Sequence, residues 1–210
     1  MYEELLGYIR KISNPHLRQA VEYYFVKDEA FIKSFKGHSA AKTVHHGFAG
    51  GLLEHTLSVT KMCEYFVNAY DILNADLLYA SAVCHDIGKT KELSNFPDND
   101  YTDIGQLVGH IVIGVEMIGE AIRTIPDFPE KLANEWKHCI VAHHGELEYG
   151  SPKKPALAEA VALNLADNAD AKMQTLKEIF KDKSGTDWLG YNRLFESNLR
   201  KTSLSEESKS

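Results

Sequence analysis

Five segments of this sequence each carry a side chain of a type that binds divalent metal ions. They are His55 in LLEHTLSV, His85 with Asp86 in AVCHDIGK, His110 in LVGHIVIG, His143 with His144 in IVAHHGEL, and Asp167 in LNLADNAD. Small or apolar residues surround each of them, and a lone charge or imidazole is costly to bury there. A single histidine of this kind is more often an ordinary core or surface residue. Five such segments together favour one shared metal centre inside a helical bundle.

The donor types indicate which metals and which chemistry would suit this centre. Imidazoles and carboxylates without thiolates suit Mn²⁺, Fe²⁺, Mg²⁺ or Zn²⁺. A carboxylate such as Asp86 can bridge two ions, and two ions about 3.5–4 Å apart can activate a water and clamp a phosphoryl group. Lys89 follows at the same helix end and could face a phosphate, although a solvated lysine near a helix end is an equally good interpretation.

Helices must position these side chains, because apolar residues recur with helical spacing along most of the chain. The spacing predicts helices over residues 5–12, 17–25, 28–37, 51–69, 75–88, 105–124, 130–143 and 156–181. Asp28 and Asn74 are the expected N-caps of two of them. No segment shows sustained strand alternation, so the predicted fold class is all-α.

We expect residues 1–182 to form a single helical domain. Residues 1–40 would be an N-terminal helical extension and residues 40–182 the catalytic core. Residues 183–210 would form a C-terminal extension, whose polar tail over 201–210 is expected to be disordered.

Composition excludes several classes of protein. The 210 residues include 23 basic and 30 acidic side chains, a net charge of −7, which excludes a uniformly basic nucleic-acid binder. Residues 51–170 hold 19 acidic and 8 basic side chains, so the acidity is concentrated around the candidate metal ligands.

The three cysteines, Cys63, Cys84 and Cys139, are odd in number and widely spaced, which is typical of buried core thiols. No apolar run approaches the roughly 18 residues of a membrane span, and the N-terminus is unlike a signal peptide, so a cytoplasmic protein is expected.

The order of the candidate ligands resembles the signature of the HD-domain metal-dependent phosphohydrolase superfamily. More closely, HHGFAGGLLEHTLSV, CHDIGKTKEL, GHIVIG, AHHGELEYGSP and ADNADA resemble the HD catalytic domain of the YhaM-type 3′–5′ exoribonucleases. The resemblance covers about residues 40–180 and implies an HD-domain helical bundle with a metal centre in its core.

The resemblance also implies a role for each candidate residue. His55, His85, Asp86 and Asp167 would hold one divalent ion, and Asp86, His110 and His143 a second, with Asp86 bridging. The catalytic residues would be Asp86, Lys89 and His144, where His144 either binds metal or donates to the phosphate. Lys89 would face the substrate phosphate. The charge pattern, apart from the resemblance, favours His46 and Lys42 as further substrate-binding residues, since residues 31–46 contain several basic side chains and no acid; a solvated basic loop is the alternative interpretation.

The function implied is hydrolysis of phosphoester bonds in nucleotides or at RNA 3′ ends by a metal-bound hydroxide. The YhaM-type enzymes carry an OB-fold domain before the HD domain, whereas about forty residues with a helical pattern stand there in this chain. We therefore expect a nucleotide or a short single-stranded RNA as substrate, with no membrane and no stable protein partner, and self-association stays open. Two alternatives remain, an HD-type di-iron oxygenase and a non-catalytic nucleotide-binding regulatory module.

Overall fold

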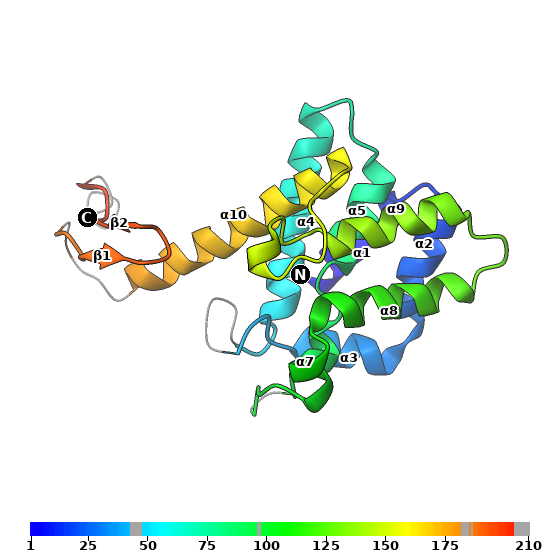
Figure 1. The fold of residues 1–210 in the computed structure, drawn as a ribbon, viewed down its shortest axis with the longest axis horizontal. Helices are drawn as coiled ribbons and strands as arrows, with labels where there is room; N and C mark the ends of the chain where they lie inside the picture. Colours follow the sequence, from blue (N-terminus) through cyan, green and yellow to red (C-terminus); the bar gives the residue numbers. More distant parts are fainter. Residues whose placement is uncertain (43–47, 96–97, 182–184, 186, 204–210) are drawn as a thin grey trace. The chain divides into compact units, whose positions relative to one another are not determined.

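The computed structural model describes residues 1–42, 48–95, 98–181, 185 and 187–203 (Figure 1). Its helices are α1 (Tyr2–Lys11), α2 (Pro15–Glu22), the π-helix η1 (Tyr23–Lys27), α3 (Glu29–Gly37), α4 (Gly51–Ala69), α5 (Ala75–Cys84), α6 (Lys89–Glu92), α7 (Asp103–Leu107), α8 (His110–Arg123), α9 (Glu130–Val141), the 3-10 helix η2 (Leu147–Tyr149) and α10 (Ala158–Lys181). The strands among the described residues are β1 (Tyr191–Asn192) and β2 (Ser197–Asn198), which pair antiparallel. The all-α fold class is confirmed.

Contacts along the chain define two compact units. The first is Met1–Lys172 and the second is Met173–Ser210. The division falls within α10, about ten residues before the domain end expected at residue 182. The predicted boundaries at residues 40 and 182, and the disorder predicted for residues 201–210, stay predictions. Among the described residues, no helix combines the length and apolarity needed to cross a bilayer.

Side-chain caps mark the beginnings of α2 and α3, and Asp28 is one of the predicted caps. The Asn14 side chain accepts hydrogen bonds from the backbone N–H groups of His16 and Leu17, and Pro15 occupies the first helical position. The Asp28 side chain accepts from the backbone N–H of Phe31 at the start of α3. The helix predicted over residues 17–25 is interrupted after Glu22, where the chain continues as the π-helix η1.

Two packed helix pairs form the core around the candidate ligands. α4 packs along α5, α8 packs along α9, and α5 also contacts α9 (Figure 1). α4 has the predicted bounds, and it buries a face at helical spacing that includes Leu52, His55, Val59 and Cys63. All three cysteines are buried and free, which confirms their assignment to the core.

Two predicted helices were too long, and both errors fall beside candidate ligands. The helix predicted over 75–88 ends at Cys84, so that His85 and Asp86 lie in the turn before α6. The helix predicted over 105–124 is divided into α7 and α8 at Gly109, whose φ of 77° is in the region that favours glycine. His110 therefore begins a helix rather than lying within one.

Gly88 allows the turn after α5 to approach α8 closely. A Cβ at this position would lie 2.0 Å from the carbonyl oxygen of His110 and 2.8 Å from the backbone nitrogen of Gly114. No side chain fits between these backbones, so the HDIGK segment and the first turn of α8 require glycine here.

Candidate metal centre

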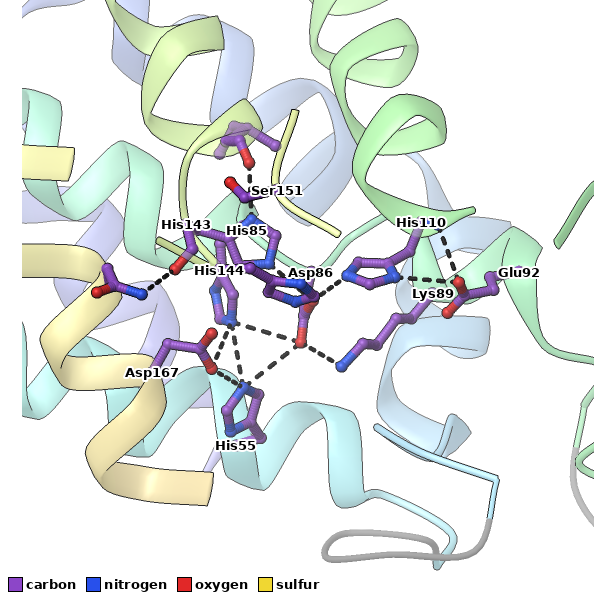
Figure 2. A network of polar contacts seen from close by, with 12 residues as sticks. His55, His85, Asp86, Lys89, Glu92, His110, His143, His144, Ser151 and Asp167 are labelled. Atoms are coloured by element: carbon purple, nitrogen blue, oxygen red, sulfur yellow. Dashed lines mark hydrogen bonds and ion pairs between the residues drawn. The ribbon is translucent and has the colours of Figure 1, made fainter. Parts of the chain in front are cut away.

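The structure brings the six predicted metal ligands and His144 together in the first unit (Figure 2). They come from separate elements: His55 from α4, His85 and Asp86 from the turn after α5, His110 from the start of α8, His143 and His144 from the turn after α9, and Asp167 from α10. Since these elements are distant in sequence, only the tertiary fold brings their side chains together.

One group consists of His55, His85 and Asp167, whose ligand atoms lie within 4.8 Å of one another. The Nε2 atoms of His55 and His85 are 3.2 Å apart, and Asp167 Oδ1 lies 3.1 Å from His55 Nε2 and 3.9 Å from His85 Nε2. His55 and His85 are buried, whereas Asp167 is partly exposed. Two imidazoles and one carboxylate could hold one divalent ion and leave positions for other ligands.

A second group consists of His110, His143 and His144, again with ligand atoms within 4.8 Å. Among the described residues, His110 Nε2 and His143 Nε2 are buried without a hydrogen-bond partner. Buried polar atoms without partners are rare in proteins. A metal ion between these nitrogens would remove that cost.

Asp86 lies between the two groups (Figure 2). Its Oδ2 is 3.4 Å from both His55 Nε2 and His85 Nε2, while its Oδ1 is 3.5 Å from His110 Nε2 and 3.7 Å from His143 Nε2. Each carboxylate oxygen therefore faces a different group, as a bridging ligand requires. Asp86 Oδ1 is also buried, and it has no hydrogen-bond partner in the described part of the chain.

The opposite nitrogen of every imidazole in the centre contacts an acceptor. Three of the rings contact backbone carbonyl oxygens through Nδ1: His85 with Ala82 at 2.8 Å, His143 with Ile140 at 2.7 Å, and His144 with Tyr149 at 2.9 Å. The other two contact carboxylates through Nδ1: His55 with Asp170 at 2.7 Å, and His110 with Glu92 at 3.0 Å. A carbonyl or carboxylate oxygen only accepts, so Nδ1 carries a proton in each ring. Nε2 is then the atom available to a metal, which is the arrangement typical of histidine ligands in proteins.

The charge states follow from burial and neighbouring groups. Burial alone would raise the pKa of Asp86, but Lys89 and His85 hold it well below its ordinary value. The pKa of Asp167 is likewise lowered against burial, by His55 first. Burial lowers the pKa of His143 and of His144, so both rings are neutral at pH 7 and can act as ligands.

His55 differs because carboxylates face both of its nitrogens. Burial would lower its pKa, yet hydrogen bonds to Asp167, Asp170 and Asp86 raise it well above the ordinary value. The metal-free protein therefore holds a proton on His55 that a metal ion at Nε2 would displace.

Lys89 contacts the centre through Asp86, with Nζ 2.7 Å from Oδ2. Burial disfavours the charged ammonium, but the Asp86 carboxylate raises the pKa of Lys89 above its ordinary value. Lys89 is consequently a protonated donor at the edge of the centre.

The predicted substrate-binding residues outside the centre have other surroundings. Lys42 Nζ lies 2.5 Å from Asp100 Oδ1, on the segment before α7. His46 lies outside the described residues. In the basic stretch 31–46, His38 is buried directly after α3.

Asp170 and Glu92, the carboxylates that contact His55 and His110, are not among the predicted site residues. Asp170 is buried, and the Ser58 hydroxyl also donates to it. Its spacing of three residues from Asp167 could have placed it on the same face of α10. Glu92 Oε1 accepts from both the backbone N–H and the ring of His110, a pairing across 18 residues that no local pattern indicates.

Comparison with known families assigns this bundle to a class. The HD-domain family matches residues 52–172, a range that contains the six predicted metal ligands and His144. The chain belongs to the HD-domain family, which confirms the resemblance found in the sequence.

Relatives with a named activity extend this assignment. The chain is 39% identical over 178 residues to the 3′-5′ exoribonuclease YhaM of Shouchella clausii (strain KSM-K16), covering 84% of this chain and 54% of the relative. It is 37% identical over 177 residues to the 3′-5′ exoribonuclease YhaM of Bacillus subtilis (strain 168), covering 84% and 55%. This chain thus spans about half the length of the curated relatives it matches. No solved structure matches it.

Proposed function

We propose that this chain is a metal-dependent phosphohydrolase that cleaves phosphoester bonds of nucleotides or of RNA 3′ ends. The observation that carries the proposal is the convergence of five imidazole Nε2 atoms and two carboxylates on one buried centre, with every Nδ1 held by an acceptor. The names of the relatives, 3′-5′ exoribonucleases, support RNA as a substrate class.

The centre fits two divalent ions, drawn from Mn²⁺, Fe²⁺, Mg²⁺ and Zn²⁺. His55, His85 and Asp167 would hold one ion, His110 and His143 the other, and Asp86 would contribute one oxygen to each. His144 is the further candidate ligand of the second group. When bound, such ions lower the pKa of a water and offset the negative charge of the phosphoryl group.

Phosphoester hydrolysis adds water to phosphorus, breaks the bond to the leaving oxygen and returns a proton to that oxygen. Lys89 remains protonated beside Asp86 and is placed to donate to a phosphate oxygen or to the leaving oxygen. Asp86 remains ionised and could not act as a proton donor at neutral pH. The side chains of this centre therefore contribute by holding fixed charges beside the phosphate and by orienting it.

Lys42 and His46 stay in the proposal as substrate-binding residues of the segment before α4. Lys42 would have to exchange Asp100 for a phosphate, which is reasonable because an ion pair between exposed side chains adds little stability.

The test combines metal analysis with a panel of phosphoesters. Full-length protein, loaded with Mn²⁺, Mg²⁺, Fe²⁺ or Zn²⁺, is assayed on a chromogenic phosphodiester, mononucleotides, cyclic nucleotides and single-stranded RNA. We expect turnover with at least one metal, and loss of both metal and turnover in Asp86→Ala. Asp71→Ala, which removes an exposed carboxylate after α4, is the matched control and should behave as wild type.

Two outcomes would contradict the proposal. Full turnover by Asp86→Ala would show that the chemistry does not depend on this centre. Absence of turnover on every substrate would contradict phosphohydrolase activity of this chain. The oxygenase alternative would be favoured if the iron-loaded protein consumes O₂ and hydrolyses no phosphoester.

A further inference from the structure

A pocket of about 240 Å³ adjoins the second ligand group. Its apolar lining consists of Val108, Ile111, Val112, Tyr149 and Pro152. His110 and His144 line it as well, so the pocket borders the second ligand group. A molecule whose phosphate lies beside these two histidines could extend into it.

The walls of this pocket come from two sides of the centre. Val108, Ile111 and Val112 belong to the α7–α8 junction, where α8 starts at His110. Tyr149 ends η2, and its carbonyl oxygen accepts from His144 Nδ1 at 2.9 Å. The backbone that orients a candidate ligand therefore also carries the aromatic side chain of the pocket.

The charge of the lining side chains makes this pocket unsuitable for a phosphate group. Among the described lining residues there is no lysine or arginine, and the charged one is Glu92, whose Oε1 accepts from the backbone and ring of His110. An anion would be repelled here, whereas an uncharged planar group would meet aliphatic walls and a tyrosine. Tyr149 is 63% exposed and Val112 42%, although both are apolar enough to favour burial.

We propose that this pocket binds the base of the nucleotide whose phosphate lies at the metal centre, with Tyr149 as its aromatic contact. The inference rests on the proposed function, because it takes a nucleotide as the ligand. Aromatic stacking accepts any base, since every base has a π-face, and it needs no charged group. Tyr149 would thus favour nucleotides over other phosphoesters without selecting one base.

The test measures binding rather than turnover. Calorimetry compares adenosine 5′-monophosphate with ribose 5-phosphate on Mn²⁺-loaded full-length protein. We expect the nucleotide to bind about 5- to 20-fold more tightly than the base-free ligand. Tyr149→Ala should bring the two affinities within about twofold, and Tyr149→Phe should restore the difference, because the ring rather than the hydroxyl makes the contact.

Two further variants keep the result interpretable. Val112→Asp changes the α8 side of the lining at an exposed helix position and should also weaken nucleotide binding selectively. Tyr65→Ala removes an equally exposed tyrosine from the later part of α4 and should leave both affinities unchanged. Equal Mn²⁺ content in all variants verifies that the centre is intact, since the Tyr149 carbonyl that contacts His144 is backbone.

The inference is overturned if wild-type protein binds the two ligands equally or binds neither, or if Tyr149→Ala retains the preference for the nucleotide. Failure of the proposed function would look different. Hydrolysis of every phosphoester would then be absent, while the calorimetric preference for the nucleotide and its dependence on Tyr149 could still be measured.

Discussion

Replacing Asp170 by Asn should weaken metal binding although Asp170 is not a proposed ligand. Its Oδ2 lies 2.7 Å from His55 Nδ1, and its other oxygen accepts from the Ser58 hydroxyl. An asparagine can keep the shape and both hydrogen bonds, with its amide group donating to Ser58. The substitution therefore isolates the loss of one buried negative charge.

The magnitude follows from the distance between that charge and the ion. A dication at His55 Nε2 would lie about 7 Å from the Asp170 carboxylate, given ordinary metal–nitrogen bonds. At effective dielectric constants of about 20–80, the attraction is about 1–5 kcal/mol. Carboxylates that orient histidine ligands typically contribute 10–100-fold to metal affinity, or about 1.4–2.7 kcal/mol. We expect a loss in that range for Asp170→Asn.

The assay is competitive Mn²⁺ titration with a fluorescent chelator, at pH 7.5 and constant ionic strength. Asp71→Asn removes an exposed carboxylate and controls for the change in net charge. Thermal unfolding of the metal-free proteins separates a folding defect from a binding defect. Wild-type affinity in Asp170→Asn, with Asp71→Asn also unchanged, would refute a contribution of this buried negative charge to metal binding.

Two further predictions concern packing and pH. Gly88→Ala should lower the free energy of unfolding by about 2–3 kcal/mol and weaken metal binding, because its Cβ would meet the backbone of His110. Gly7→Ala is the control, because its Cβ would meet no described atom within 4 Å beyond its own helix backbone and chain neighbours, and it should raise the free energy of unfolding by about 0.5–1 kcal/mol. Urea denaturation measures both changes. An unchanged Gly88→Ala would contradict the close approach. The pH prediction concerns Glu64, whose pKa is lowered in the folded protein by its hydrogen bond with Lys11. The stability from this contact is therefore fully present above the unfolded pKa near 4.5, and it is lost as the pH falls through the lower folded pKa. The difference in unfolding free energy between wild type and Glu64→Gln, about 0–1 kcal/mol at pH 7, should shrink toward pH 3, and a constant difference would argue against it.

The fold was predictable where local chemistry determines it. The side chains of Asn74 and Asp28 cap the helices that follow them, as predicted. The apolar spacing also predicted the bounds that α4 has in the structure. The breaks beside the ligands were less evident, although Gly109 between Val108 and His110 is a signal for a break that periodicity alone conceals. The strands β1 and β2 have two residues each, which is too short for any alternation to be visible.

The candidate ligands were predictable because metal-binding residue types stand out among apolar neighbours. Their partners were not, since Glu92 reaches His110 only through the packing of α6 against α8. The pocket beside His110 and His144 was equally hidden, because residues from α8 and from the η2 segment meet there only in the folded chain.

The most direct test of the two-metal centre is a crystal structure of the Mn²⁺-loaded protein, with anomalous data collected at the manganese absorption edge. The arrangement predicts two anomalous peaks about 3.5–4 Å apart, one beside His55, His85 and Asp167, the other beside His110 and His143, with Asp86 between them. No peak at these residues, or a pair of ions that Asp86 does not bridge, would contradict it.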